Sequence, residues 1–456
     1  MRKLALLEVA AGRMRRCSRI FGGQAAVKGA GLALWGVLAA AWGLALGGVC
    51  VADERPVSGQ AAMKLLRVRI AEEAKRTAAS PPGNADRVVR EGVEWYAGRL
   101  LFESEGGAGP ELRPECALSL LTLAWREPGQ RFHRADRTRS ALAHAMKRAA
   151  PAAGSADAGR GSGLAERRAA QVLVEALFAA GEEVDGASAA AVTRALDRLS
   201  ERTQGRGPAE RSWRARARLA LAVWRRDVSG AMQARDDVLA ALAEADAAAL
   251  SGAPEGLVER TLCAADALCV RAWTQGTELA APDCAATALR DVEGFFAWLW
   301  RGRTVDPLLA PDRGDAEVLE AAALEGALRG GVRPDSLFAL GLEAWGERGE
   351  EWPGLTALTL ARLCPLPAAE GWPGEWRGGL RTLANAEGGA AIAKTQRRTV
   401  SMTTHSAPDD GVCVRAGEHG LFNVYDGARA ALLRRTEARN VCPGALVLSS
   451  GEAPAG

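Results

Sequence analysis

LVERTLCAADALCVRAWT, residues 257–274, shows most clearly which kind of fold this chain adopts. Apolar residues recur there every three or four positions and cover most of the helix surface, which is typical of a helix buried in a core. The stretch 284–300 has the same character. We therefore expect both segments to be central helices.

The same apolar spacing extends outward over residues 58–364, between short gaps rich in glycine and proline. No strand pattern interrupts it, so we predict an all-α body over residues 53–370, built from about twelve paired helices. Ser188 is the expected N-cap of one of them. The predicted helices are 60–79, 88–103, 113–125, 135–149, 164–180, 188–201, 209–226, 231–250, 257–274, 284–300, 315–328, 335–345 and 355–363.

Three arrangements fit paired helices of this kind: a solenoid of hairpins, an irregular bundle, and hairpins closed into an (α/α) toroid. A solenoid should repeat at a fixed period with recurring residues, and no tetratricopeptide, ankyrin or armadillo consensus is present. The helices and gaps also differ in length. The pattern therefore favours a toroid or an irregular array.

A small antiparallel β element is predicted for residues 385–450. Short β-prone runs at 399–404, 412–414, 421–425 and 445–448 are separated by turn residues. Some sixty residues make a thin sheet, which needs support from the helices or from a disulfide.

The N-terminal residues 1–52 are expected to direct export. Basic residues, among them Arg2 and Lys28, precede an uncharged apolar run. Cys50 and Ala52 supply the small residues that a signal peptidase needs for a cut before Asp53. The run is also long enough to be an uncleaved membrane anchor. Both alternatives place the body outside the cytoplasm, in the periplasm or the extracellular space.

Export makes disulfide bonds possible, and seven cysteines follow the expected cut. Cys413 and Cys442 each lie near a predicted strand, so we predict a bond between them. Cys263 and Cys269 fall on different faces of one helix and should not pair. The spacings match no zinc pattern, and we expect neither a metal site nor a cofactor.

The formal net charge of +3 is spread along the chain and forms no basic face, so nucleic acid is not an expected partner. Membrane contact is expected only through the N-terminal segment, if it stays uncleaved. Thirteen tryptophans accompany only two tyrosines. Trp352, Trp372 and Trp376 occupy connections rich in proline and glycine. Their indoles could stack on sugar rings or cap the helical core.

Two short stretches, RFHRAD at 131–136 and SMTTH at 401–405, resemble segments of the heparinase-like polysaccharide lyases and their relatives. The layout of an exported helical body followed by β structure is also similar to theirs. The chain departs from that family in having a much smaller β part and fewer tyrosines. The resemblance implies an α/α toroid that acts on a polysaccharide, with a uronate lyase as the specific expectation.

A uronate lyase needs a base, a group that neutralises the enolate, and an acid for the leaving oxygen. In the C-terminal polar cluster, His405 would be the base, Asn423 or Arg415 the neutralising group, and Tyr425 the acid. The same cluster could instead be the polar edge of a small sheet. A cation held by His405, Asp409 and His419 is a further interpretation.

Arg131 and His133 lie in a loop before a helix and are candidates for holding an anionic sugar, although a solvated loop would look the same. Two functions from different classes remain open. One is a polysaccharide-acting enzyme, and the other is a non-catalytic helical scaffold or binding protein of the cell envelope. An enzyme should gather His405, Tyr425, His133 and loop tryptophans around one cleft, whereas a scaffold should scatter them.

Overall fold

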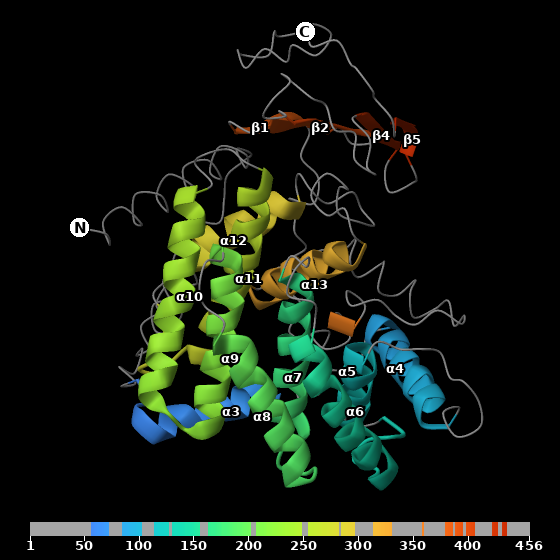
Figure 1. The fold of residues 1–456 in the computed structure, drawn as a ribbon, viewed down its shortest axis with the longest axis vertical. Helices are drawn as coiled ribbons and strands as arrows, with labels where there is room; N and C mark the ends of the chain where they lie inside the picture. Colours follow the sequence, from blue (N-terminus) through green and yellow to red (C-terminus); the bar gives the residue numbers. More distant parts are fainter. Residues whose placement is uncertain are drawn as a thin grey trace, which may run out of the picture. The chain divides into compact units, whose positions relative to one another are not determined.

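Helices make up most of what the structure, a computed structural model, describes (Figure 1). Side chains are described in most of the helices and in none of the strands. The mainly helical class is confirmed. The described residues are 56–72, 84–102, 114–126, 130–155, 163–201, 207–248, 254–281, 284–296, 313–330, 358–359, 379–385, 388–394, 398–405, 422–426 and 431–435.

Eleven helices lie within these described residues, and α7 has the predicted bounds. Most of the others begin or end within a few residues of their predicted positions. The predicted helix 335–345 lies outside the described residues, and only 358–359 of 355–363 are described. The helices are α3 Gly59–Glu72, α4 Asn84–Phe102, α5 Pro114–Arg126, α6 Asp136–Ser155, α7 Leu164–Ala180, α8 Gly186–Glu201, α9 Pro208–Arg225, α10 Val228–Ala248, α11 Pro254–Thr274, α12 Ala285–Gly294 and α13 Arg313–Arg329.

The helices pack as two rows of hairpins. Helices α5, α7, α9, α11 and α13 each contact the next in this series, and α13 also contacts α7, so this inner row curls back on itself. Helices α6, α8, α10 and α12 each pack against two members of the inner row. Helix α3 lies across α7 and α9 (Figure 1).

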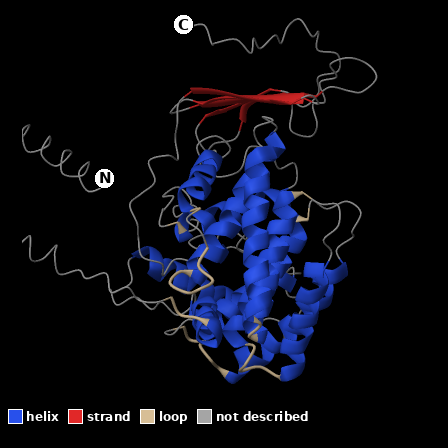
Figure 2. Ribbon diagram, turned by 90° about the vertical axis from the view of Figure 1, so that its left-hand side faces the viewer, coloured by secondary structure: helices blue, strands red, loops and turns tan. Residues whose placement is uncertain are grey.

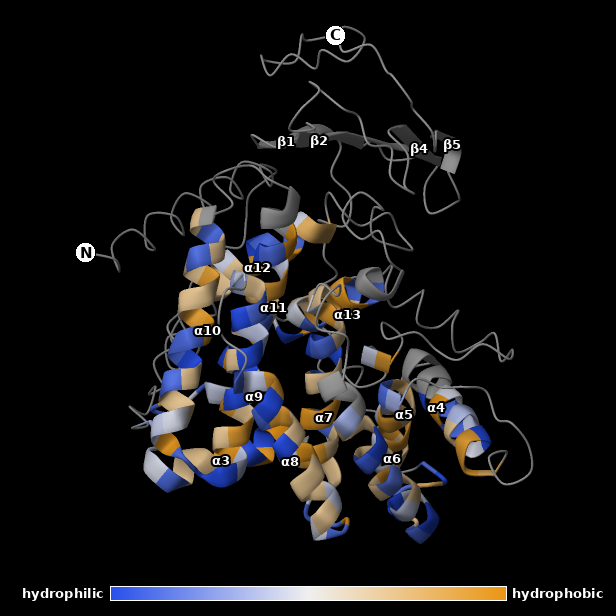
Figure 3. Ribbon diagram, in the orientation of Figure 1, coloured by the Kyte–Doolittle hydropathy of each residue, from blue (hydrophilic) through white to orange (hydrophobic). Residues whose placement is uncertain are grey.

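One hydrophobic core runs through this array, from Met63 of α3 to Leu324 of α13. Residues 261–270 of α11 are all buried, as their apolar character predicted. Figure 3 shows that α5 and α13 also carry mostly hydrophobic residues. Burial on several sides of the inner helices explains why their apolar residues are not confined to one narrow stripe.

The start of α8 differs from its prediction. The helix begins at Gly186, two residues before the expected N-cap Ser188. Asp185 takes that role instead, because its Oδ1 accepts a hydrogen bond of 2.9 Å from the backbone N–H of Ser188. The hydroxyl of Ser188 donates to Asp185 Oδ2 at 2.7 Å. These hydrogen bonds lower the pKa of Asp185 to about 2.

Five strands form an antiparallel sheet in the order β1-β2-β3-β4-β5, coloured red in Figure 2. Ser401 lies opposite Asn423, and a register shift occurs between Val424 and Tyr425. The strands are β1 Gly379–Asn385, β2 Gly388–Lys394, β3 Arg398–His405, β4 Phe422–Asp426 and β5 Ala431–Arg435.

Among the described helices, none is both long and apolar enough to cross a membrane. The predicted signal peptide or anchor, residues 1–52, lies outside the described residues, as do Cys413 and Cys442. No disulfide joins Cys263 to Cys269 on α11, as their helical spacing predicted.

Candidate functional site

A cluster of buried charges lies where α7, α9, α11 and α13 pack together. Arg167 of α7 donates from Nη1 and Nη2 to the two carboxylate oxygens of Asp266 on α11, each at 2.8 Å. Arg216 of α9 lies between two acids, with its Nη1 3.2 Å from Asp266 Oδ1 and 3.3 Å from Glu325 Oε2. The cluster therefore connects four of the five inner helices, α7, α9, α11 and α13, through charge-assisted hydrogen bonds.

Glu325 of α13 is the second carboxylate of this cluster. Arg329, one turn later, lies 3.0 Å from its Oε1, and Gln171 of α7 donates to its Oε2 at 3.2 Å. Burial opposes the charged form of Glu325, but the positive charges of Arg216 and Arg329 outweigh burial and lower its pKa. Burial likewise opposes the charge on Arg216, yet its acidic neighbours, Glu325 first, raise its pKa. Both groups are therefore ionised.

The sequence of α9 explains how Arg214 and Arg216 are both buried on the same helix. Arg214 and Arg216 are two positions apart, so they leave the helix on different sides. Neighbours cover both sides, because α9 packs against α7, α8, α10 and α11. Arg214 points to a second acidic group, with its Nη2 2.7 Å from Glu166 Oε2.

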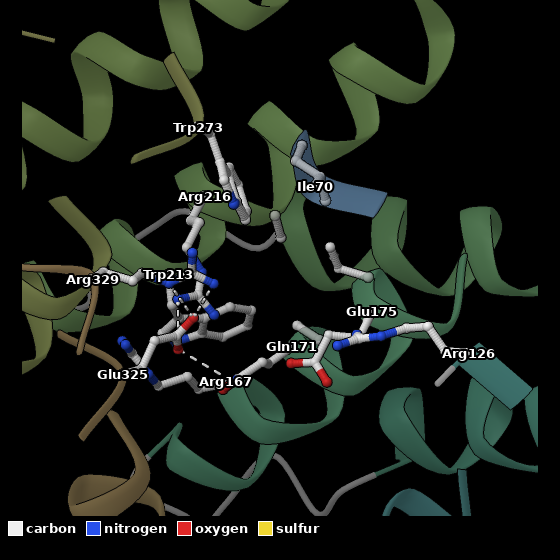
Figure 4. A pocket seen from close by; sticks show the side chains of 13 residues that line it. Ile70, Arg126, Arg167, Gln171, Glu175, Trp213, Arg216, Trp273, Glu325 and Arg329 are labelled. Carbon is white, nitrogen blue, oxygen red and sulfur yellow. Dashed lines mark hydrogen bonds and ion pairs between the residues drawn. The ribbon is translucent and has the colours of Figure 1, made fainter. Parts of the chain in front are cut away.

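A small cavity of about 20 Å³ adjoins the cluster (Figure 4). That volume holds roughly one water-sized particle and is far too small for a sugar ring. Four arginines but only two glutamates face it. The lining residues are Ile70, Arg126, Arg167, Ala170, Gln171, Val174, Glu175, Trp213, Arg216, Ala217, Trp273, Glu325 and Arg329.

A larger groove of about 640 Å³ lies between α3 and the C-terminal ends of α5, α7 and α9. Its volume is in the range typical of ligand pockets. The groove is lined by Gln60, Ala61, Met63, Lys64, Arg67, Val68, Ala71, Arg126, Phe178, Ala179, Ala180, Glu182, Glu183, Trp224 and Arg226.

An arginine stacked on a tryptophan forms the centre of the groove. The Arg67 guanidinium lies 4.2 Å from the centroid of the half-buried Trp224 ring. Phe178 meets the same indole edge-on, with the ring centroids 5.5 Å apart. Gly181 allows this close packing, because a Cβ there would lie 2.9 Å from Trp224 Cη2. Arg67 also pairs with the exposed Glu182.

Positive groups outnumber negative ones along the groove. Lys64, Arg67, Arg126 and Arg226 line it together with Glu182 and Glu183, which leaves an excess of two positive charges. Glu182 and Glu183 supply oxygen acceptors, whereas carbonyls at the ends of α5, α7 and α9, such as those of Trp125, Ala180 and Val223, already accept backbone N–H groups. The groove thus combines an aromatic and aliphatic floor, cationic donors and oxygen acceptors. That combination suits an anion rich in hydroxyl groups.

The structure places Arg131 and His133 beside this groove, in the turn that precedes α6. Arg134 of the same turn lies 3.0 Å from Glu183, which lines the groove. Arg131 is exposed, and its guanidinium lies 5.7 Å from the ring centroid of Phe132. His133 Nδ1 is buried and has no hydrogen-bond partner among the described residues. Their sugar-binding role stays a prediction, with a position close to the groove.

The three predicted catalytic residues lie in the sheet. His405 is opposite Gly388, Asn423 opposite Ser401 and Tyr425 opposite Thr399. At about 3.3 Å per residue, His405 is therefore displaced along β3 by roughly 13 Å from Asn423 and roughly 20 Å from Tyr425.

Only the backbone of these strands is described, so the catalytic roles stay predictions. The other predicted residues, Trp352, Trp372, Trp376 and Arg415, lie outside the described residues, and so do Asp409 and His419 of the cation interpretation. Where side chains are described, no three His, Cys, Asp or Glu residues converge as a metal site requires.

Neither the groove nor the buried cluster was predicted from the sequence. A signal for the cluster was present in α9, where WRARARLALAVW, residues 213–224, sets arginines into an otherwise apolar helix. The pairing of Arg67 with Trp224 joins residues 157 positions apart, and no local pattern indicates it.

No known family description matches this chain, and no curated protein sequence matches it. Three solved structures have a backbone that follows a partly similar path. The chondroitin AC lyase of Streptomyces coelicolor A3, in complex with chondroitin sulphate, has a TM-score of 0.49 and 15% identity; the match covers 80% of this chain and 57% of that one. A Paenibacillus xanthan lyase has a TM-score of 0.47 and 9% identity, with coverage of 80% and 40%.

A chondroitinase AC lyase, studied as oligosaccharide complexes, has a TM-score of 0.44 and 13% identity, with coverage of 76% and 50%. The present chain thus spans about half the length of these enzymes. The resemblance is weak and concerns the fold only, so it does not decide what this protein binds.

Proposed function

We propose that this protein binds an acidic polysaccharide in the groove between α3 and the C-terminal ends of α7 and α9. The observation that carries the proposal is the Arg67 guanidinium stacked 4.2 Å from Trp224 inside a groove of about 640 Å³. Such a pair offers an apolar surface and a fixed positive charge at one place.

The chemistry of the groove matches that of a charged sugar chain. Sugar rings have apolar faces, for which the half-buried Trp224 and the exposed Val68 provide contact. A uronate or sulphate group needs guanidinium or ammonium donors, which Arg67 and Lys64 provide. Hydroxyl groups need acceptors, and the carboxylates of Glu182 and Glu183 provide those.

The length of the groove favours a chain over a single sugar. Its α3 wall runs from Gln60 to Ala71. At 1.5 Å per residue this wall is roughly 17 Å long, enough for several sugar units in a row.

Cleavage of the bound chain forms the more specific part of the proposal. A uronate lyase would use His405, Asn423 and Tyr425 in the roles assigned above. Their displacement along the strands, roughly 13 to 20 Å, exceeds one sugar unit, so they would act together only if the sheet bends or pairs differently when substrate binds.

The second candidate is a non-catalytic binding protein of the cell envelope. The groove lining favours it, because the described lining residues include neither histidine nor tyrosine. We also propose an α/α toroid, since the curled inner row is compatible with one, and export, since residues 1–52 have the pattern of a signal peptide or anchor.

A panel of polysaccharides tests the function. The purified protein should bind chondroitin sulphate or polygalacturonate and should ignore neutral dextran of equal length, as measured by affinity electrophoresis. A lyase should also release an unsaturated uronate that absorbs in the ultraviolet. Binding without that product would establish the binding protein, and no binding to any acidic chain would refute the proposal.

A further inference from the structure

We infer that the small cavity beside the buried charge cluster is a binding site for one small monovalent anion of halide size. It lies at the charge cluster of Arg167, Arg216, Arg329, Asp266 and Glu325, where α7, α9, α11 and α13 meet. It shares Arg126 with the groove but is otherwise lined by different residues, and it would hold an ion and not a sugar.

The balance of charge is the first argument. The described cluster contains three guanidinium groups and two carboxylates, all with side chains at most 7% exposed. Adding Arg126 and Glu175, which also line the cavity, leaves the same excess of one positive charge. An excess of buried charge is costly, and one monovalent anion would neutralise the excess among these described groups.

The shape and donors of the cavity are the second argument. Its volume of about 20 Å³ admits one particle near the size of water, which excludes a carboxylate sugar or a phosphate ester. The side chains that face it are mainly hydrogen-bond donors, namely four arginines and Gln171. The Nε of Arg167 is buried and has no acceptor among the described residues. An anion in the cavity would lie among these donors.

The site has a structural consequence. The anion would join three inner helices through the arginines of α7, α9 and α13. Because only the folded chain assembles these groups, a bound anion stabilises the folded state in proportion to the logarithm of its concentration above the dissociation constant.

Equilibrium dialysis of the wild-type protein against radioactive chloride, in sodium gluconate at constant ionic strength, tests this directly. Gluconate supplies the same ionic strength but is too large for the cavity. We expect one chloride per chain, displaced by bromide and unaffected by further gluconate. No bound chloride, or many weakly bound ions that gluconate displaces, would overturn the inference.

Two variants on one helix localise the site. Arg216→Met removes a cluster arginine and should abolish the rise of Tm with chloride, whereas Arg218→Met removes a charge of the same helix that pairs with Asp237 at 2.9 Å and should retain it. If Arg216→Met does not fold, the wild-type dialysis still decides. Neither experiment involves the groove, so failure here leaves the proposed polysaccharide function untouched.

Discussion

Arg167 and Asp266 form a two-bond ion pair in the interior, with Nη1–Oδ2 and Nη2–Oδ1 distances of 2.8 Å and side-chain exposures of 1% and 0%. The residues are 99 positions apart and come from α7 and α11. Exclusion of water makes both bonds hard to replace. The pair therefore fixes how α7 and α11 face each other.

Asp266→Asn should destabilise the protein strongly, because it leaves Arg167 and Arg216 with one carboxylate fewer in the interior. Breaking a buried pair in this way typically costs about 3–5 kcal/mol. Asp237→Asn is the matched control, since its partner Arg218 is at the surface, and should cost at most about 1 kcal/mol. Urea unfolding measures both values, and equal losses would contradict the importance given to the buried pair.

Asp291 should make stability fall as the pH rises. Burial raises its pKa to about 6, with Asp246 adding to the effect, while Arg260, at 3.1 Å, opposes it. The folded state thus holds a proton that the unfolded state releases near pH 4. The contribution of Asp291 to the free energy of unfolding should be greatest below pH 4 and should decrease between about pH 4 and pH 6.

The variant Asp291→Asn removes that titration. Its free energy of unfolding, relative to wild type, should therefore increase as the pH rises from 4 to 6 and then level off. The exposed variant Asp236→Asn should show no such trend. A wild-type protein that gains stability relative to Asp291→Asn over this range would contradict the raised pKa.

Asp185→Ala should loosen the start of α8, because the backbone N–H of Ser188 loses its acceptor. Amide hydrogen exchange at residue 188 should become faster, whereas the interior of α7 should not change. With its pKa lowered to about 2, Asp185 keeps this bond until the pH falls to about 2, and the wild-type amide should lose its protection only as the pH passes through that value. An unchanged exchange rate at residue 188 would show that Asp185 does not cap α8.

Gly181→Ala should damage both the end of α7 and the groove. The added Cβ would collide with the backbone oxygen of Leu177 and would lie 2.9 Å from Trp224 Cη2, so the last turn of α7 and the indole beside Phe178 would both have to shift. We expect weaker binding of an acidic polysaccharide and an altered near-ultraviolet circular dichroism spectrum. Gly186→Ala, whose Cβ meets nothing within 4 Å, is the control and should bind as wild type does.

The helices could be predicted from the sequence because their cause is local. Apolar spacing and helix-breaking residues gave α7 its bounds, and the continuous burial of residues 261–270 followed from composition. The cap of α8 was misplaced by three residues, since Asp185 and Ser188 are both good caps and only the hydrogen bond distinguishes them.

The groove could not be predicted, because its parts come from separate helices. Arg67 and Trp224 meet only after α3 crosses the end of α9, and neither residue is unusual in its own segment. The sequence instead pointed to His405 and Tyr425, which are chemically versatile residues close together in the chain. The strand register places them opposite Gly388 and Thr399, and their catalytic role stays a prediction.

The affinity of the Arg67→Ala variant for an acidic polysaccharide tests the central claim most directly. Arg67 should contribute a charge-assisted contact, so we expect affinity to fall about tenfold or more, which is about 1.4 kcal/mol. Arg139→Ala removes an equal charge from α6, where Arg139 pairs with Asp136 outside the groove, and should leave affinity within about twofold. Equal losses in the two variants, or none in Arg67→Ala, would show that the groove is not the polysaccharide site.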